Sequence, residues 1–192
     1  MASLAGSIPL AAGLGLRLAA PADEPFLLQL FRESRPWLAW AEGGRDFVHA
    51  LYEQQYRTLR AGLEAHYPEH LDFVIERTGQ AAGRLIVDLG YADWRLSELQ
   101  VLAAARGRGI GSDVVRSLQA AAGSRRLPIT LATPMLGATG KGVYERLGFR
   151  VTAVRPPHYE MAWHPPGLPG PGAAAAPGGA RMPLLHAADR TD

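Results

Sequence analysis

The segment whose residue types and spacing point most directly to a ligand site is a glycine-rich turn, RGRGIGS, at residues 106–112. Glycine permits positive φ angles and lets the backbone approach a ligand closely. A helix beginning near Ile110 directs its free N–H groups and the positive end of its dipole into the turn. The segment therefore predicts an anion site suited to a pyrophosphate, with Arg106 and Arg108 adding positive charge.

The two common nucleotide-binding motifs do not fit this turn. The dinucleotide fingerprint needs G-x-G-x-x-G, whereas the spacing here is G-x-G-x-G and the sixth position is Ser112. The Walker motif ends in G-K-[ST], and the turn contains no lysine. A plainer alternative stays open, in which the glycines only connect a strand to a helix.

Such a turn needs a strand before it and a helix after it, and the hydrophobic pattern supplies both. Residues 95–102 read as a strand. Apolar residues then recur at helical spacing at Ile110, Val114, Leu118 and Ala121. The turn is therefore expected to join this strand directly to this helix.

The rest of the chain alternates between short strands and helices. Further strands are expected at residues 14–18, 72–76, 83–89, 127–133, 149–154 and 159–163. Further helices are expected at residues 22–34, at 47–63 and around 143–147. The order β-α-α-β-β-β-α-β-α-β-β predicts an α/β fold, a three-layer sandwich whose mixed central sheet is flanked by helices.

Composition narrows the class of protein. The chain has 192 residues, of which 47% are hydrophobic and 20% charged, which suits one globular domain with a real core. The net charge is +2 and the basic residues are scattered, so we expect no nucleic-acid partner. Without cysteine there is no disulfide, thiolate metal site or cysteine nucleophile, which fits a cytoplasmic location.

Membrane and metal sites are also not expected. No run of 18 apolar residues exists, and residues 1–18 lack the basic start of a signal peptide. His66 and His70 are separated by Pro68, which breaks any shared helical face, so we expect no metal site. Residues 165–180 are almost all Pro, Gly or Ala, which predicts a disordered tail at 165–192 and a functional domain at 10–164.

Two segments together resemble the GNAT superfamily of N-acetyltransferases. Residues 106–111 match its pyrophosphate loop, Q/R-x-x-G-x-G/A, with glycines at Gly109 and Gly111. Residues 144–149, YERLGF, resemble its second signature. The element order is also similar over residues 10–164. Residues 36–37, 54–55 and 66–68 resemble more narrowly a bacterial subgroup whose acceptors are generally unassigned.

The resemblance implies acetyl-CoA as the co-substrate. The backbone of Val101, Leu102 and Ala103 is expected to pair with its pantetheine arm, with the Leu102 N–H polarising the thioester carbonyl. The pyrophosphate is expected to bind Arg106, Gly107, Arg108, Gly109, Ile110, Gly111 and Ser112.

The resemblance also assigns candidate catalytic and acceptor residues. Tyr144 matches the residue that donates a proton to the departing thiolate, although it also suits simple helix packing. Glu98 lies where relatives often carry an acid that takes the amine proton, although it also suits a salt-bridged strand residue. The acceptor is expected to contact Trp37, Trp40, Tyr52, Gln55, Tyr56 and Tyr159.

The sequence departs from the family at one place that affects function. The usual Asn before the second signature is replaced at Gly137 or Ala138. The predicted function is acetyl transfer from acetyl-CoA to a primary amine of a small molecule or protein, in a ternary complex of a monomer or homodimer. The missing Asn motivates the alternative of a non-catalytic acyl-CoA-binding or interaction domain. A third hypothesis is an enzyme that uses another acyl-CoA.

Overall fold

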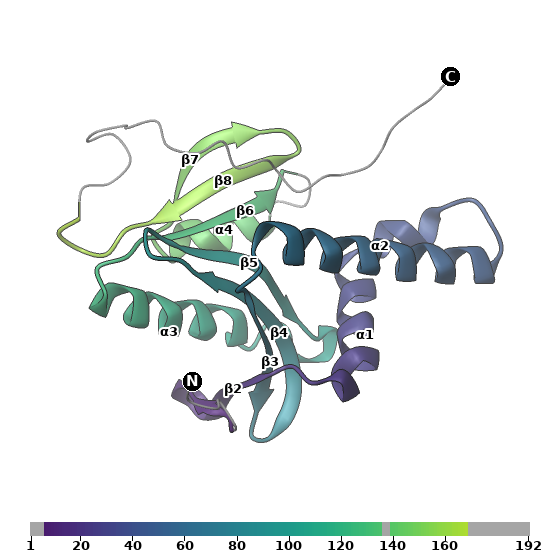
Figure 1. Cartoon of the computed structure of the whole chain (residues 1–192), viewed down its shortest axis with the longest axis horizontal. Coiled ribbons are helices and arrows are strands. Elements are labelled where there is room, and N and C mark those ends of the chain that lie inside the picture. The colour runs from purple at the N-terminus through teal and green to yellow at the C-terminus, as the bar shows by residue number, and fades with distance from the viewer. Residues whose placement is uncertain (1–5, 136–138, 169–192) are drawn as a thin grey trace.

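The computed structural model describes residues 6–135 and 139–168. Its centre is an eight-stranded mixed sheet in the order β1-β2-β3-β4-β5-β6-β8-β7 (Figure 1). The strands are β1 (Ile8–Pro9), β2 (Leu14–Leu18), β3 (Leu71–Arg77), β4 (Gln80–Leu89), β5 (Trp94–Val101), β6 (Ile129–Pro134), β7 (Arg150–Arg155) and β8 (His158–Trp163). Only β5 and β6 pair in parallel among the described strands.

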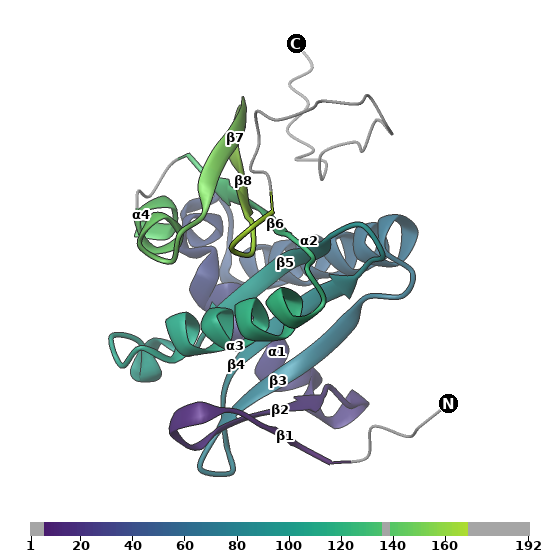
Figure 2. The same ribbon diagram turned by 90° about the vertical axis from the view of Figure 1, so that its left-hand side faces the viewer.

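Helices cover both faces of this sheet. They are α1 (Glu24–Ser34), α2 (Arg45–His66), α3 (Ile110–Ser124) and α4 (Thr139–Arg146). Helices α1 and α2 lie on one face and α3 lies on the other (Figure 2). The predicted three-layer α/β sandwich with a mixed sheet is therefore confirmed, and the short strand β1 is an addition to the predicted order.

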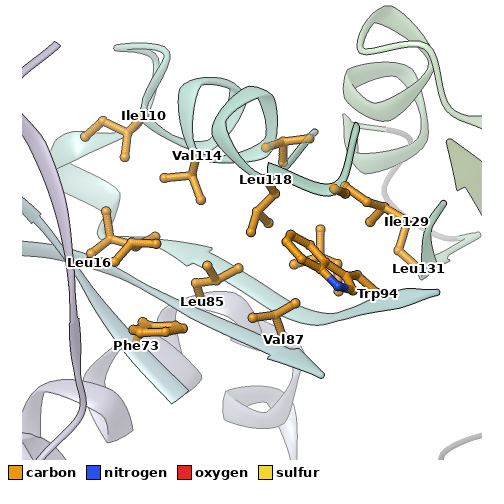
Figure 3. Close-up of a cluster of buried hydrophobic side chains, with 14 of the residues drawn as sticks. Leu16, Phe73, Leu85, Val87, Trp94, Ile110, Val114, Leu118, Ile129 and Leu131 are labelled. Carbon is orange, nitrogen blue, oxygen red and sulfur yellow. The ribbon is translucent and has the colours of Figure 1, made fainter. Parts of the chain in front are cut away.

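The larger core lies between the sheet and α3 (Figure 3). Leu85 of β4 and Val114 of α3 are completely buried, and Trp94 of β5 packs in the same cluster. Full burial of a side chain of this size contributes about 1.5–3 kcal/mol. The predicted apolar face of α3 is correct except at its end, where Ala122 is buried and Ala121 is exposed.

A second core fills the space between α1, α2 and the opposite face of the sheet. Phe31 of α1 packs edge-on against Tyr56 of α2, with ring centroids 5.4 Å apart. Tyr52 belongs to the same cluster, and Val74 of β3 contributes the contact with the sheet. Because this cluster fixes α1 and α2 against the strands, it also fixes the end of α1 beside β5.

The feature of the sheet that matters for function is the separation of β5 from β6. Their pairing runs from Trp94–Ile129 to Leu96–Leu131 and then stops. A β-bulge follows, since Glu98 pairs with Ile86 while Leu96 pairs with the next residue of β4, Val87. Beyond the bulge, β5 pairs with β4 alone within the described residues, and its other edge is open.

Three further predictions concern membrane-spanning helices, metal sites and the C-terminal tail. No helix among the described residues is both long and apolar enough to cross a membrane. No group of His, Asp or Glu in the same part of the chain could hold a metal ion. Most of the predicted tail, residues 169–192, lies outside the described residues, so the boundary at 164 stays a prediction.

Candidate functional site

The glycine turn has the geometry that an anion site needs. Gly107 and Gly109 have φ angles of +75° and +79°, a left-handed conformation that costs other residues about 1–2 kcal/mol. Gly109 is the N-cap of α3 and supplies no side-chain cap. The first intrahelical bond runs from the Asp113 N–H to the Gly109 carbonyl at 2.9 Å.

The first three amides of α3 are therefore free to bind a ligand. The N–H groups of Ile110, Gly111 and Ser112 have no hydrogen-bond acceptor within the described residues. They lie at the positive end of the helix dipole, which favours negative charge. Arg108 is exposed and takes part in no ion pair within residues 6–135 and 139–168. This arrangement fits a pyrophosphate.

The strand that leads into the turn offers a second set of backbone groups. The Leu102 N–H donates to the Ala82 carbonyl at 2.9 Å, so it points back to β4. The prediction that this N–H polarises a thioester was therefore wrong. Alternate residues of an antiparallel ladder direct their backbone groups to opposite edges, so those of Val101 and Leu99 face the open edge. Val101 is the residue placed to pair with an amide-bearing ligand.

Two other residues at this strand end already have protein partners. The Ala103 N–H donates to Glu33 Oε2 at 2.7 Å. The Arg106 side chain turns back toward the strand, where its Nε donates to the Val101 carbonyl oxygen at 2.9 Å. Arg106 thus lies on β5 and not over the glycine turn, while the amides of Ile110, Gly111 and Ser112 have no acceptor within the described residues.

Glu98 lies on the face of β5 that packs against α1. Its Oε1 is 2.8 Å from Arg35 Nη2, and its Oε2 accepts a hydrogen bond from Gln100 Nε2 at 3.1 Å. The Ser34 hydroxyl oxygen accepts from the same Gln100 amide at 3.0 Å. Both oxygens of the carboxylate are therefore held by cationic or amide donors.

Tyr144 lies in α4 and packs on the larger core. Its ring meets Phe149 edge-on, with centroids 5.5 Å apart. Burial, and to a lesser extent the negative charge of Glu98, raises the pKa of Tyr144 to about 12. The phenol is consequently protonated at neutral pH, and no hydrogen bond joins its hydroxyl to another described residue. It is available as a donor to a ligand.

One family model matches the part of the chain that contains the glycine turn. Residues 68–151, which include β3 to β6, the glycine turn and α4, match the model of the acetyltransferase (GNAT) domain. This segment is the part of the chain that is similar to the GNAT acetyltransferase domain. A comparison with curated proteins found no match.

Solved structures of acetyltransferases share the fold of this chain. The PaiA N-acetyltransferase of Thermoplasma acidophilum, in complex with coenzyme A, has a TM-score of 0.60 at 15% identity, over 79% of this chain and 98% of its own. An acetyltransferase of Thermus thermophilus has a TM-score of 0.59 at 21% identity, over 81% and 99%. The Salmonella typhimurium enzyme that modifies the N-terminal serine of a 50S ribosomal subunit protein has 0.59 at 16%, over 83% and 99%.

The fold places the predicted acceptor residues in two different environments. Tyr52 and Tyr56 are buried between α1 and α2, and the Tyr52 hydroxyl donates to the Arg35 carbonyl at 2.9 Å. They belong to the second core and line no open surface, so their predicted acceptor role was wrong. Trp37 and Trp40 are exposed by 48% and 80% on the short helix η3 (Pro36–Trp40).

Tyr159 and Gln55 stay candidates for the acceptor side. Both are partly exposed, and the Lys141 ammonium lies 5.6 Å from the centroid of the Tyr159 ring. Tyr159 of β8 pairs with Thr133 of β6, at the strand end from which α4 leads off. The position of the usual family Asn, Gly137 or Ala138, lies outside the described residues.

Four residues that contact the site were not predicted from the sequence, namely Glu33, Ser34, Arg35 and Gln100. The first three end α1 and reach β5 or the glycine turn. No local pattern reveals this, since a charged residue in the last turn of an amphipathic helix is usually solvated. Only the packing of α1 on the sheet brings them to the site.

Proposed function

We propose that the chain is an N-acetyltransferase that moves an acetyl group from acetyl-CoA to a primary amine of a small molecule or protein, within a ternary complex. One observation carries the proposal. Within residues 6–135 and 139–168, three helix amides without an acceptor adjoin a strand edge toward which the Val101 N–H points without a partner. A ligand that fills both features needs a pyrophosphate and a neighbouring amide-bearing arm, and coenzyme A has both.

The chain's own groups suit the bond changes of acyl transfer. The amine nitrogen bonds to the thioester carbon, and the carbon–sulfur bond breaks with its electron pair leaving on sulfur. The Val101 N–H faces the edge where the acyl carbonyl oxygen would lie and can stabilise the charge that develops there. Glu98 accepts the amine proton directly or through water, with Arg35 and Gln100 fixing its orientation.

The pKa of Tyr144 refines its role. Thiols ordinarily have a pKa of about 8.5, so full proton transfer from a phenol of pKa about 12 to a thiolate is uphill. Tyr144 therefore donates a hydrogen bond to the departing sulfur, which needs only that the phenol keep its proton. The proton released by the amine then neutralises the product thiolate through solvent.

The solved structures with a similar fold suggest which acceptors to test. The Salmonella enzyme acts on an N-terminal serine, so peptides with free N-termini belong in the first panel beside small primary amines. Release of free thiol from acetyl-CoA is measured with and without each amine. Amine-dependent release supports the proposal. Binding of coenzyme A without amine-dependent release for any class of amine would favour the non-catalytic alternative.

A further inference from the structure

The carbonyl of Val101 is the acceptor that the open edge of β5 presents, and a side chain of the protein already uses it. Arg106 Nε donates to this oxygen at 2.9 Å. An amide-bearing ligand that lies along the edge must share or take this acceptor, because strand addition works through such backbone groups. Arg106 therefore lies where the ligand arm would lie and uses the Val101 carbonyl oxygen that the arm would need as an acceptor.

Glu33 holds Arg106 in this position. Arg106 Nη2 lies 3.8 Å from Glu33 Oε2 and 3.5 Å from the Glu33 carbonyl oxygen. The same carboxylate oxygen accepts the Ala103 N–H at 2.7 Å. Glu33 lies in the last turn of α1, where the helix dipole disfavours a negative charge, so these two donors offset an otherwise poor location.

Arg106 has an alternative partner within its own segment. It is the first residue of the turn that leads to the free amides of α3. A pyrophosphate bound there offers a guanidinium two acceptor oxygens and a higher charge than one carboxylate. The Arg106 side chain is 50% exposed, so half of its surface is in contact with solvent.

We infer that Glu33 competes with coenzyme A for Arg106. In the free protein Arg106 forms an ion pair with Glu33 and donates to the Val101 carbonyl oxygen. When coenzyme A binds, Arg106 leaves both partners and pairs with the pyrophosphate. This inference rests on the proposed function only for the identity of the ligand. Its consequence is that Glu33 weakens coenzyme A binding, although Glu33 lies on α1, outside both family signatures.

The test uses calorimetric titration of the full chain with coenzyme A. Glu33→Gln keeps an oxygen for the Ala103 N–H and removes the charge that holds Arg106. Because a partly exposed ion pair is worth a fraction of a kcal/mol to about 1, the dissociation constant should fall about threefold. An unchanged or larger dissociation constant would mean that the pair organises the site, and the inference would be overturned.

A second pair of variants separates competition from simple repulsion between Glu33 and the anionic ligand. In an Arg106→Gln background, Glu33→Gln should change the dissociation constant by less than about 1.5-fold. A gain that persists there shows plain repulsion and overturns the inference. Absence of coenzyme A binding by the unmodified chain contradicts the proposed function itself, which keeps the two failures distinct.

Discussion

The carboxylate of Glu98 lies 2.8 Å from the guanidinium of Arg35, which joins strand β5 to the end of helix α1. Arg35 also stacks 4.2 Å over the ring centroid of Phe31, so the ion pair is anchored in the second core. Glu98 therefore has a structural role in this ion pair and a proposed catalytic role as proton acceptor. The structural role predicts an effect of its variants on stability, which is measured separately from activity.

Removal of both partners of this pair should cost less than the sum of the two single removals. Arg35→Gln or Glu98→Gln alone leaves a largely buried charge without its partner and should lower the free energy of unfolding by about 1–3 kcal/mol. The double variant should lose less than the sum of the two. Urea denaturation of the four proteins measures the coupling, and additive losses would show that the pair contributes nothing.

Tyr144→Phe should separate binding from turnover. The ring keeps its packing on Phe149, so the affinity for coenzyme A should stay within about twofold, while loss of the hydrogen bond to sulfur should lower kcat at least about tenfold. Tyr91→Phe is the matched control, because that phenol is fully exposed. Equal kcat values for the two variants would contradict the role of Tyr144.

Acid should destabilise the domain through Asp23. Hydrogen bonds from Arg17 lower the pKa of Asp23 to about 2, against 3.8 for the free side chain. A depressed pKa contributes stability above the unfolded value, and this contribution disappears as the pH falls from about 4 to 2. Asp23→Asn should therefore flatten the decline in unfolding free energy by roughly 1–2 kcal/mol over this range. Parallel curves for the two proteins would contradict the assignment.

The two glycines of α4 should respond oppositely to alanine. A Cβ on Gly140 would lie 2.6 Å from the buried Thr133 Oγ1, so Gly140→Ala should cost about 1–3 kcal/mol. A Cβ on Gly142 would lie 3.5 Å from the flexible Arg146 side chain, so Gly142→Ala should stabilise the helix by up to about 1 kcal/mol. Thermal unfolding measures both. A neutral Gly140→Ala would mean that α4 does not need its close approach to β6.

Local patterns predicted the elements well because each depends on nearby residues. The alternation of Leu14 and Leu16 and the helical spacing of Ile110, Val114 and Leu118 follow directly from burial of one face, whereas Leu18 continues the alternation but is exposed. The left-handed glycines of the turn could also be predicted, since their spacing needs no tertiary information.

The details that depend on pairing between distant segments could not be predicted. Whether Leu102 or Val101 faces the open edge is decided by the register of β5 against β4, which the local sequence does not reveal. Tyr52 and Tyr56 were predicted to contact the acceptor, and only the packing of α1 against them shows that they are buried. The contact of Arg35 with Glu98 likewise exists only after both helices dock on the sheet.

The central claim is that the turn before α3 binds coenzyme A, and a pair of matched glycine variants tests it most directly. Gly109 and Gly79 both have left-handed φ angles, of +79° and +77°, but Gly79 lies in the distant β3–β4 turn. Valine at either position imposes similar backbone strain. Calorimetric titration of the full chain should show coenzyme A binding that survives Gly79→Val and is lost in Gly109→Val. Equal affinities for the two variants, or no binding by the unmodified chain, would contradict the account.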